Sequence, residues 1–312
     1  MREFEKTALG IFPTPVYKLE NISRMLGTQV YIKRDDMTGL GLGGNKVRKL
    51  EYLLADAKAK GAEVVFTTGG AQSNHAMLTA AACRKLGMTP ILILKKRGVT
   101  ARQGNQLLEH LMGVDVRMMD TDSYDDIDAE MDRVGQALGK NYYKIPCGGS
   151  DALGTLGYVD CVREIRDQGM QFDHIVCAEG SGGTMAGLAL GAKLYMPDTR
   201  VTGMMVDTDP FDQITLELMR EAAALLGADV SVTAEDFDLR DMCGPGYAIP
   251  SEDGNAAVSM MAAQEGLFLD PVYTGKAFAG LIAMAKKGVF KPADRVLFLH
   301  SGGAGGLFAV GV

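Results

Sequence analysis

The stretch Gly39-Leu40-Gly41-Leu42-Gly43-Gly44-Asn45-Lys46 lies between a β-branched run, Val30-Tyr31-Ile32-Lys33, and a helix-like run from 47 to 60. Glycines permit positive φ angles and a close approach of the backbone to a ligand. The lysine that ends the loop can serve as a point charge for phosphate, or as a desolvated amine that forms a Schiff base with a carbonyl. A mobile loop with a solvated lysine is the third interpretation. A P-loop is excluded, because that motif needs Gly-Lys-Ser/Thr and the chain has Asn45-Lys46-Val47.

Strands and helices alternate along most of the 312 residues. Short β-branched or apolar runs predict strands at 30–33, 63–67, 90–94, 114–118, 142–145, 174–177, 201–206 and 296–299. Amphipathic stretches predict helices at 47–60, up to 85, at 102–112, 123–138 and 152–168, from 184 onward, and at 211–226. This alternation predicts an α/β protein with mostly parallel sheets covered by helices on both faces. Turn residues at 146–150 predict a seam between two lobes.

The composition is that of an ordinary globular protein, with 47% apolar and 23% charged residues. A net charge of −7 argues against a nucleic acid or an anionic membrane as partner. No apolar run could span a bilayer and the first residues lack a signal-peptide core, so we expect a cytoplasmic protein. The five cysteines form no Cys-x-x-Cys pair and the four histidines show no ligand spacing. We therefore expect neither a disulfide framework nor a metal site.

Residues that packing does not explain gather where four predicted strands end. In an α/β sheet, ligands bind beyond the carboxyl ends of the strands. The first exit is the loop that ends at Lys46. The second carries Ser73, Asn74 and His75 at the start of a helix, where free N–H groups and the positive dipole end favour a substrate carboxylate. Ser73 and Asn74 could instead be plain N-caps.

The third exit carries Gly180-Ser181-Gly182-Gly183-Thr184, again between a strand and a helix. Successive backbone N–H groups in such a loop form a nest suited to a phosphate. The dinucleotide fingerprint is poorly matched, because Met185 stands where its third glycine should be. A phosphate-binding loop is therefore favoured over an NAD site.

The fourth exit delivers Ser301 with two glycines after the apolar strand at 296–299. This hydroxyl is either a turn residue or a group that faces a ring nitrogen. Tyr247 and Tyr273 each lie among turn residues, so we expect phenols that face a pocket, with amphipathic packing as the alternative. A lysine amine, a phosphate loop, a carboxylate site, a hydroxyl and phenols together match the needs of pyridoxal phosphate (PLP).

These motifs resemble those of the D-cysteine desulfhydrase / 1-aminocyclopropane-1-carboxylate deaminase family of PLP enzymes, which have the tryptophan-synthase-β-like fold called fold type II. The resemblance covers nearly the whole chain, through 13–15, 32–36, 43–46, 72–75, 180–184, 270–273 and 301–303. It implies two three-layer α/β/α lobes with PLP in the cleft between them. A large PLP-binding domain would comprise 1–48 plus 156–312, and a small domain 49–155. The family also implies a homodimer.

The resemblance further implies a role for each matching residue. Lys46 would hold PLP as a Schiff base, next to Asn45, and Asn74 would contact the cofactor's phenolic oxygen. The loop at 180–184 would hold the phosphate. Ser73, Asn74 and His75 would bind the substrate carboxylate, and Tyr247 and Tyr273 would line the substrate face, where either could move a proton. Ser301, with Thr274, would face the pyridine nitrogen.

The two branches of this family differ at positions that the chain shows. The deaminases characteristically carry Glu after the Asp-Pro-Val-Tyr tyrosine and Leu before the late Gly-Gly, whereas Thr274 and Ser301 stand here. A neutral hydroxyl does not keep the pyridine nitrogen protonated, and β-elimination of a thiolate needs less electron withdrawal than opening a cyclopropane ring. We therefore expect D-cysteine desulfhydrase activity. The alternatives are a lyase or deaminase for L-cysteate, D-serine or 1-aminocyclopropane-1-carboxylate, or a non-catalytic protein that binds a phosphorylated metabolite.

Glu179 departs from the family pattern, because relatives usually carry Ser or Thr directly before the phosphate loop. A carboxylate there would repel a phosphate dianion unless it points away or pairs with a cation. A role on the substrate side is the alternative.

Overall fold

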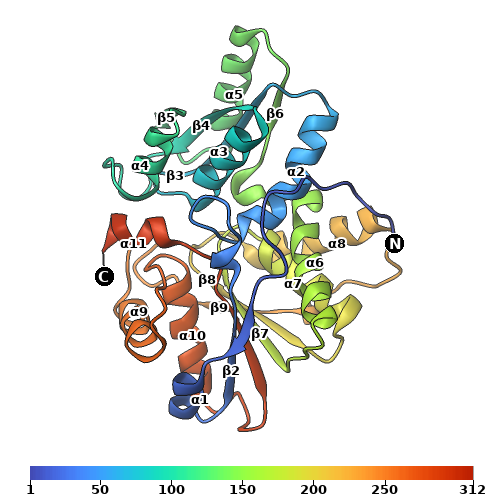
Figure 1. Ribbon diagram of the computed structural model, residues 1–312, viewed down its shortest axis with the longest axis vertical. Helices are drawn as coiled ribbons and strands as arrows, with labels where there is room; N and C mark the ends of the chain where they lie inside the picture. The colour runs from blue at the N-terminus through green and yellow to red at the C-terminus, as the bar shows by residue number, and fades with distance from the viewer. Residues whose placement is uncertain (312) are drawn as a thin grey trace.

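Two sheets covered by helices make up the computed structural model, which describes residues 1–311 (Figure 1). The larger sheet has the strand order β1-β2-β10-β7-β8-β9. Its strands are β1 (Val16–Lys18), β2 (Gln29–Lys33), β7 (His174–Glu179), β8 (Arg200–Met205), β9 (Asp238–Asp241) and β10 (Arg295–Leu299). All neighbours run parallel except β1, which pairs antiparallel with β2. The predicted α/β class with mostly parallel sheets is confirmed.

The smaller sheet is entirely parallel, in the order β5-β4-β3-β6. Its strands are β3 (Val64–Gly70), β4 (Thr89–Lys95), β5 (Asp115–Met119) and β6 (Tyr142–Lys144). All four lie within 49–155, and the strands of the larger sheet lie outside that segment. Figure 1 shows the two sheets in separate parts of the molecule, with α2 (Lys46–Ala59) running between them.

Alternate side chains of each strand pack against different helices, as the two-residue period of a strand requires. Val64 and Phe66 of β3 pack with α5 (Tyr124–Leu138), whereas Val65 packs with α2 and α3 (Asn74–Leu86). In the larger sheet, Ile175 packs with α6 (Ala152–Asp167), α7 (Gly183–Tyr195) and α8 (Phe211–Leu226). Val176 faces α1 (Glu20–Leu26), α9 (Glu252–Glu265) and α10 (Thr274–Lys286) instead. Each sheet is thus the middle of three layers.

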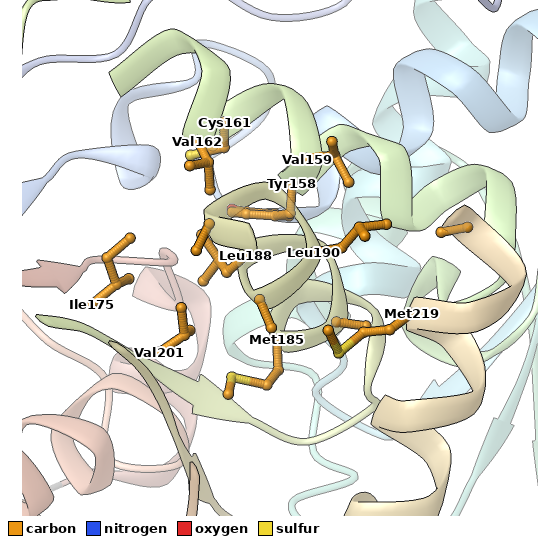
Figure 2. Packing of buried hydrophobic residues seen from close by; sticks show 14 of the residues in the cluster. Tyr158, Val159, Cys161, Val162, Ile175, Met185, Leu188, Leu190, Val201 and Met219 are labelled. Atoms are coloured by element: carbon orange, nitrogen blue, oxygen red, sulfur yellow. The ribbon is translucent and has the colours of Figure 1, made fainter. Parts of the chain in front are cut away.

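The largest apolar cluster joins α6, α7 and α8 to the larger sheet, as Figure 2 shows around Met185 and Leu188. Helices α6 and α7 approach closely because a glycine lies at their contact. A Cβ added at Gly187 would lie 2.5 Å from the Tyr158 Cβ and from the Thr155 carbonyl oxygen. Close packing here fixes the start of α7, which follows the glycine loop of the third strand exit.

A buried ion pair ties α2 to the segment that follows β2. The Arg48 guanidinium donates to both carboxylate oxygens of Asp35, from Nε at 2.8 Å and from Nη2 at 2.9 Å, and the Tyr158 hydroxyl donates to Asp35 at 2.6 Å. Burial raises the pKa of Asp35, whereas the Arg48 guanidinium lowers it. The combined effect of the ion pair is the larger, and the resulting pKa of Asp35 is about 2. Because Arg48 lies two residues after Lys46, this contact fixes the beginning of α2.

The remaining helices are α4 (Gly104–Leu111) and α11 (Ala304–Val310), with 3-10 turns at Asp35–Met37, Cys147–Gly149 and Ala234–Asp236. The sequence did not predict β1, β9, α1, α9, α10 or α11. Strand β9 was not predicted because three of its four residues are charged, so it lacks an apolar pattern. It lies at a sheet edge, where charged side chains remain hydrated. Within residues 1–311, no helix has the length and apolar character needed to cross a membrane.

Candidate active site

A cleft lies where strands of both sheets end and the following helices begin. It encloses about 880 Å³, part of it open to solvent. The predicted site residues that line it are Asn45, Lys46, Ser73, Asn74, His75, Gly180, Ser181, Thr184, Tyr247, Tyr273 and Ser301. Segments far apart in the sequence therefore converge on one cavity, as expected for the carboxyl ends of parallel strands.

Lys46 is the first residue of α2 and faces this cleft, where its side chain is only partly exposed. Loss of hydration lowers the pKa of the Lys46 amine. The glycine loop before it packs tightly: a Cβ at Gly43 would lie 1.8 Å from the Asp36 carbonyl oxygen. The Asn45 N–H donates to the Ser301 carbonyl oxygen at 2.9 Å. The loop thus packs against two neighbouring segments, which places the amine.

The glycine loop between β7 and α7, residues 180–184, is the predicted phosphate-binding nest. Gly182 has a φ of 84°, a conformation that favours glycine. The Gly183 N–H donates to the Ser150 hydroxyl at 3.2 Å, and the Asn45 side-chain amide donates to the Thr184 hydroxyl at 3.0 Å. The nest therefore gathers backbone N–H groups and hydroxyls at the start of a helix, where protein acceptors occupy the N–H groups in this structure.

Lys49, one helical turn after Lys46, lies beside this nest and is fully buried. Its ammonium donates to the Gly148 carbonyl at 3.1 Å and to the Ser150 hydroxyl at 3.1 Å. A Cβ at Gly183 would lie 2.8 Å from the Lys49 Nζ, so a larger residue there would displace the end of the Lys49 side chain. Burial and the neighbouring Lys46 hold the pKa of Lys49 well below its usual range.

Glu179 turns its carboxylate into the nest and is 1% exposed. One oxygen, Oε1, accepts the N–H groups of Ser181 at 2.9 Å and of Gly182 at 2.5 Å. The other, Oε2, is buried without a hydrogen-bond partner among residues 1–311. Burial raises the pKa of Glu179. The carboxylate thus points into the loop between β7 and α7 rather than away from it.

The start of α3 carries the predicted carboxylate site. Ser73 caps the helix, since its hydroxyl accepts the Ala76 N–H at 3.2 Å, and it also lines the cleft. His75 is buried, and its Nε2 pairs with the Thr67 hydroxyl at 2.8 Å. Burial, with Lys46 and Lys49 nearby, lowers the pKa of His75 well below its usual value, so its imidazole is neutral at physiological pH.

The two predicted tyrosines form a pair. The hydroxyls of Tyr247 and Tyr273 lie 2.5 Å apart, and their rings meet edge to face with centroids 6.0 Å apart. The Arg97 guanidinium lies 4.8 Å from the Tyr247 ring centroid. Burial raises the pKa of Tyr247 to about 12 and raises the pKa of Tyr273 well above its usual value. Both phenols are therefore protonated at neutral pH.

The structure separates Thr274 from Ser301, which the sequence had grouped together. Ser301 lines the cleft, whereas Thr274 does not. The Thr274 hydroxyl is fully buried and donates to Asp270 Oδ1 at 2.7 Å, where it helps to begin α10. Asp270 also accepts the N–H groups of Val272 and Tyr273. This network leaves Ser301 as the predicted ring-nitrogen partner that faces the cavity.

Sequence reasoning missed several residues that lie in the cleft or beside it. Lys49 and Ser150 flank the nest, and Arg97 pairs with Asp207 at 3.2 Å across the cleft wall. Lys49 could have been found, because residues three apart on a helix share a face and Lys46 marks that face. Arg97 carries no comparable signal. No group of His, Cys, Asp or Glu side chains that could hold a metal ion occurs in the described 1–311 segment.

Residues 7–302 match the protein family described as "Pyridoxal-phosphate dependent enzyme". The chain belongs to this family. A "D-cysteine desulfhydrase" from Klebsiella pneumoniae is 43% identical to this PLP-dependent enzyme, over 99% of the chain and 97% of the relative. A "Putative 1-aminocyclopropane-1-carboxylate deaminase" from Pyrococcus horikoshii is also 43% identical, over 100% of the chain and 95% of the relative. The crystal structure of an "ACC deaminase homologue" matches with a TM-score of 0.91 at 43% identity, over 98% and 94% of the two chains. The predicted family and fold type are confirmed, and the relatives' names differ in substrate.

The residues of this PLP enzyme fit its cofactor. A phosphate dianion in the nest would take the N–H groups that now donate to Glu179 and Ser150, and its charge would favour the ammonium form of the nearby buried Lys49. The unpartnered Glu179 Oε2 and the lowered pKa of Lys49 both mark a polar region whose charges are not balanced by the protein alone. Lys46, with its lowered pKa, would bond the aldehyde carbon through its amine.

Proposed function

We propose that this PLP-dependent enzyme eliminates the β substituent of a small amino acid, and that D-cysteine is its substrate. The balanced reaction takes D-cysteine and water to pyruvate, sulfide and ammonia. The observation that carries the proposal is a lysine amine of lowered pKa in the same cleft as two protonated phenols. Such a cleft offers a base for the Cα proton and an acid for the leaving sulfur.

Bound PLP withdraws electrons from the amino acid and so acidifies its Cα–H bond. The Lys46 Nζ holds the cofactor and, when free, accepts the Cα proton. The Tyr273 hydroxyl, held by Tyr247, donates a proton to the sulfur as the Cβ–S bond breaks. The Ser73 hydroxyl and the N–H groups at the start of α3 bind the substrate carboxylate. Asn74 would donate from its side-chain amide to the phenolic oxygen of bound PLP.

Two features support sulfur elimination over cyclopropane opening. The cleft residue that follows β10 is Ser301, a neutral hydroxyl that does not hold a proton on a pyridine nitrogen. A relative 43% identical over nearly its whole length is named D-cysteine desulfhydrase. Deaminase activity on 1-aminocyclopropane-1-carboxylate is the second candidate, because other relatives of similar identity carry that name.

A product assay separates these candidates. Purified enzyme with added PLP is supplied with D-cysteine, L-cysteine, D-serine, L-cysteate or 1-aminocyclopropane-1-carboxylate, and the oxo acid and sulfide are measured. We expect pyruvate and sulfide from D-cysteine, and no product from the Lys46→Ala variant. If 2-oxobutyrate from the cyclopropane acid is the dominant product, the deaminase assignment replaces ours.

We also infer that the enzyme acts in the cytoplasm as a homodimer. All five cysteines are free, as is usual in a reducing compartment. Light scattering on the purified enzyme tests the dimer, and a mass corresponding to one chain would refute it.

A further inference from the structure

Asn105 is a fully buried polar residue at the beginning of α4, outside the cleft and without a role in the chemistry above. Its side-chain Nδ2 donates to the Gln72 carbonyl oxygen at 2.8 Å and to Asn74 Oδ1 at 2.8 Å. Its backbone N–H donates to Gln72 Oε1 at 2.9 Å. Asn105 therefore connects α4 to the turn that leads into the candidate substrate site.

These hydrogen bonds determine which way the Asn74 amide faces. A backbone carbonyl can only accept, so the atom of Asn105 that contacts the Gln72 carbonyl must be its nitrogen. The same nitrogen contacts Asn74, so the atom of Asn74 on that side must be its oxygen. The Asn74 Nδ2 is then the free end of the amide, and it has no protein acceptor among the described residues. Asn74 lines the cleft, so the end left for a ligand is a donor.

Packing leaves Asn105 little room to turn. A Cβ at Gly305 of α11 would lie 2.0 Å from Asn105 Oδ1, and one at Gly104 would lie 2.4 Å from the Gly305 carbonyl oxygen. Gln72 is held in turn, because its Nε2 donates to the Val99 carbonyl at 3.0 Å. The orientation of the Asn74 amide is thus imposed by a rigid neighbour.

We infer that Asn105 is a positioning residue, which fixes the Asn74 amide with Nδ2 toward the phenolic oxygen of bound PLP. This inference rests on the proposed role of Asn74. A donor at that oxygen stabilises its anionic form, whereas a reversed amide would place an oxygen against it. Asn105 would therefore control the acidity of the cofactor's chromophore without contacting the cofactor.

The Asn105→Asp variant tests this idea with little change of shape. An aspartate carboxylate accepts only, so it would bond Asn74 Nδ2 and reverse the amide. The readout is the pH midpoint of the absorbance change of enzyme-bound PLP near about 420 nm, the region typical of a Schiff base. We expect the midpoint to rise by roughly one pH unit or more, the equivalent of losing a hydrogen bond to a charged group. Asn105→Ala and Asn74→Ala should shift it in the same direction.

Gln103→Ala is the matched control. Gln103 precedes α4 and its Nε2 donates to the Ala309 carbonyl at 2.7 Å, so it links α4 to α11 without reaching Asn74. The pH midpoint of the absorbance change in Gln103→Ala should equal that of the wild type. A shift in Gln103→Ala as large as in Asn105→Asp would overturn the inference, since loosened packing would explain both. The inference would also be overturned if the pH midpoint of Asn105→Asp equalled that of the wild type while the midpoint of Asn74→Ala was shifted. A wild-type enzyme that forms no such chromophore would refute the proposed function itself.

Discussion

Replacing Glu179 by serine should tighten the binding of a phosphate-bearing ligand. The Glu179 carboxylate accepts hydrogen bonds from the N–H groups of Ser181 and Gly182, at 2.9 and 2.5 Å. A phosphate in the nest requires the same donors. Either the carboxylate withdraws, or it stays close to the phosphate and must lose its charge. A serine at this position removes that conflict.

The size of the effect follows from Coulomb's law. A phosphate oxygen that takes these donors would lie within about 5 Å of the carboxylate, and two unit negative charges at that distance repel by about 3 kcal/mol at an effective dielectric of about 20. Because about 1.4 kcal/mol corresponds to a tenfold change in Kd, the variant should bind up to about 10²-fold more tightly. Protonation of Glu179 is an alternative to withdrawal, so this figure is an upper limit.

The ratio of the wild-type Kd to the Glu179→Ser Kd should depend on pH. Burial raises the pKa of Glu179, so this carboxylate gains its proton at a higher pH than an exposed one. As the pH falls, the repulsion disappears and the wild-type Kd should approach that of the variant. The ratio of the two Kd values is therefore largest at alkaline pH. The ionisation of the ligand's own phosphate cancels in this ratio.

The assay is calorimetric titration with pyridoxine 5′-phosphate, which carries the phosphate but no aldehyde to react with Lys46. Glu179→Gln separates charge from hydrogen bonding, because its amide oxygen still accepts from the nest. Asp209→Asn is the control for a change of charge in the cleft, since Asp209 lines the cleft but the N–H groups of Ser181 and Gly182 donate to Glu179 instead. Equal Kd values for wild type and Glu179→Ser across the pH range would refute the reasoning.

Three further predictions concern stability and turnover. Asp35→Asn should lower the free energy of unfolding by about 3 kcal/mol, because it removes one of the two carboxylates that pair with the buried Arg48 guanidinium and leaves only Glu164. The stabilisation from Asp35 is present above pH 3.8 and is lost as the pH falls through about 2; urea unfolding that changes by less than about 1 kcal/mol would contradict this. Burial raises the pKa of Glu109 to about 8, so its contribution to stability is complete below 4.5 and is lost as the pH rises through 8. Glu109→Gln should accordingly flatten the fall of Tm with pH over that interval, and an unchanged slope would count against it. Tyr273→Phe should lower kcat for D-cysteine by about 10²-fold, the usual contribution of a positioned proton donor, while binding of the substrate changes little. Steady-state pyruvate release measures this, and a loss under about tenfold would assign the proton transfer elsewhere, with Tyr247 the next candidate.

The sequence predicts those parts of the site that a single strand–turn–helix unit creates. Lys46 and the loop at 180–184 are recognisable because each follows a strand, carries glycines and begins a helix. Ser73 is recognisable for the same reason, although the sequence could not say that one hydroxyl both caps α3 and lines the cleft. Local order is sufficient here, since the carboxyl end of a parallel strand is a binding position wherever it occurs.

Contacts between distant segments are the part that the sequence does not reveal. Thr274 and Ser301 both carry hydroxyls, yet Asp270 satisfies the first and leaves the second facing the cavity. Asp270 and Thr274 are only four residues apart, but their pairing depends on how α10 begins. Lys49 becomes a candidate phosphate partner only because the turn with Ser150 folds back against α2.

The charges around Lys46 explain why a glutamate can be tolerated beside a phosphate loop. Lys46 must be neutral to accept a proton, and the negative charge of Glu179 raises the pKa of its amine. A phosphate beside Lys49 would add to that effect, because any negative charge nearby favours the ammonium form. If phosphate binding protonates Glu179, one negative charge is removed as the phosphate arrives, and the rise in the Lys46 pKa is partly offset. The serine variant lacks this carboxylate in every state, so wherever Glu179 stays ionised the Lys46 pKa is higher in the wild type than in the variant. The variant should therefore need a lower pH, or at most the same pH, for half-maximal turnover, and a higher one would show that Glu179 does not raise the pKa of the base.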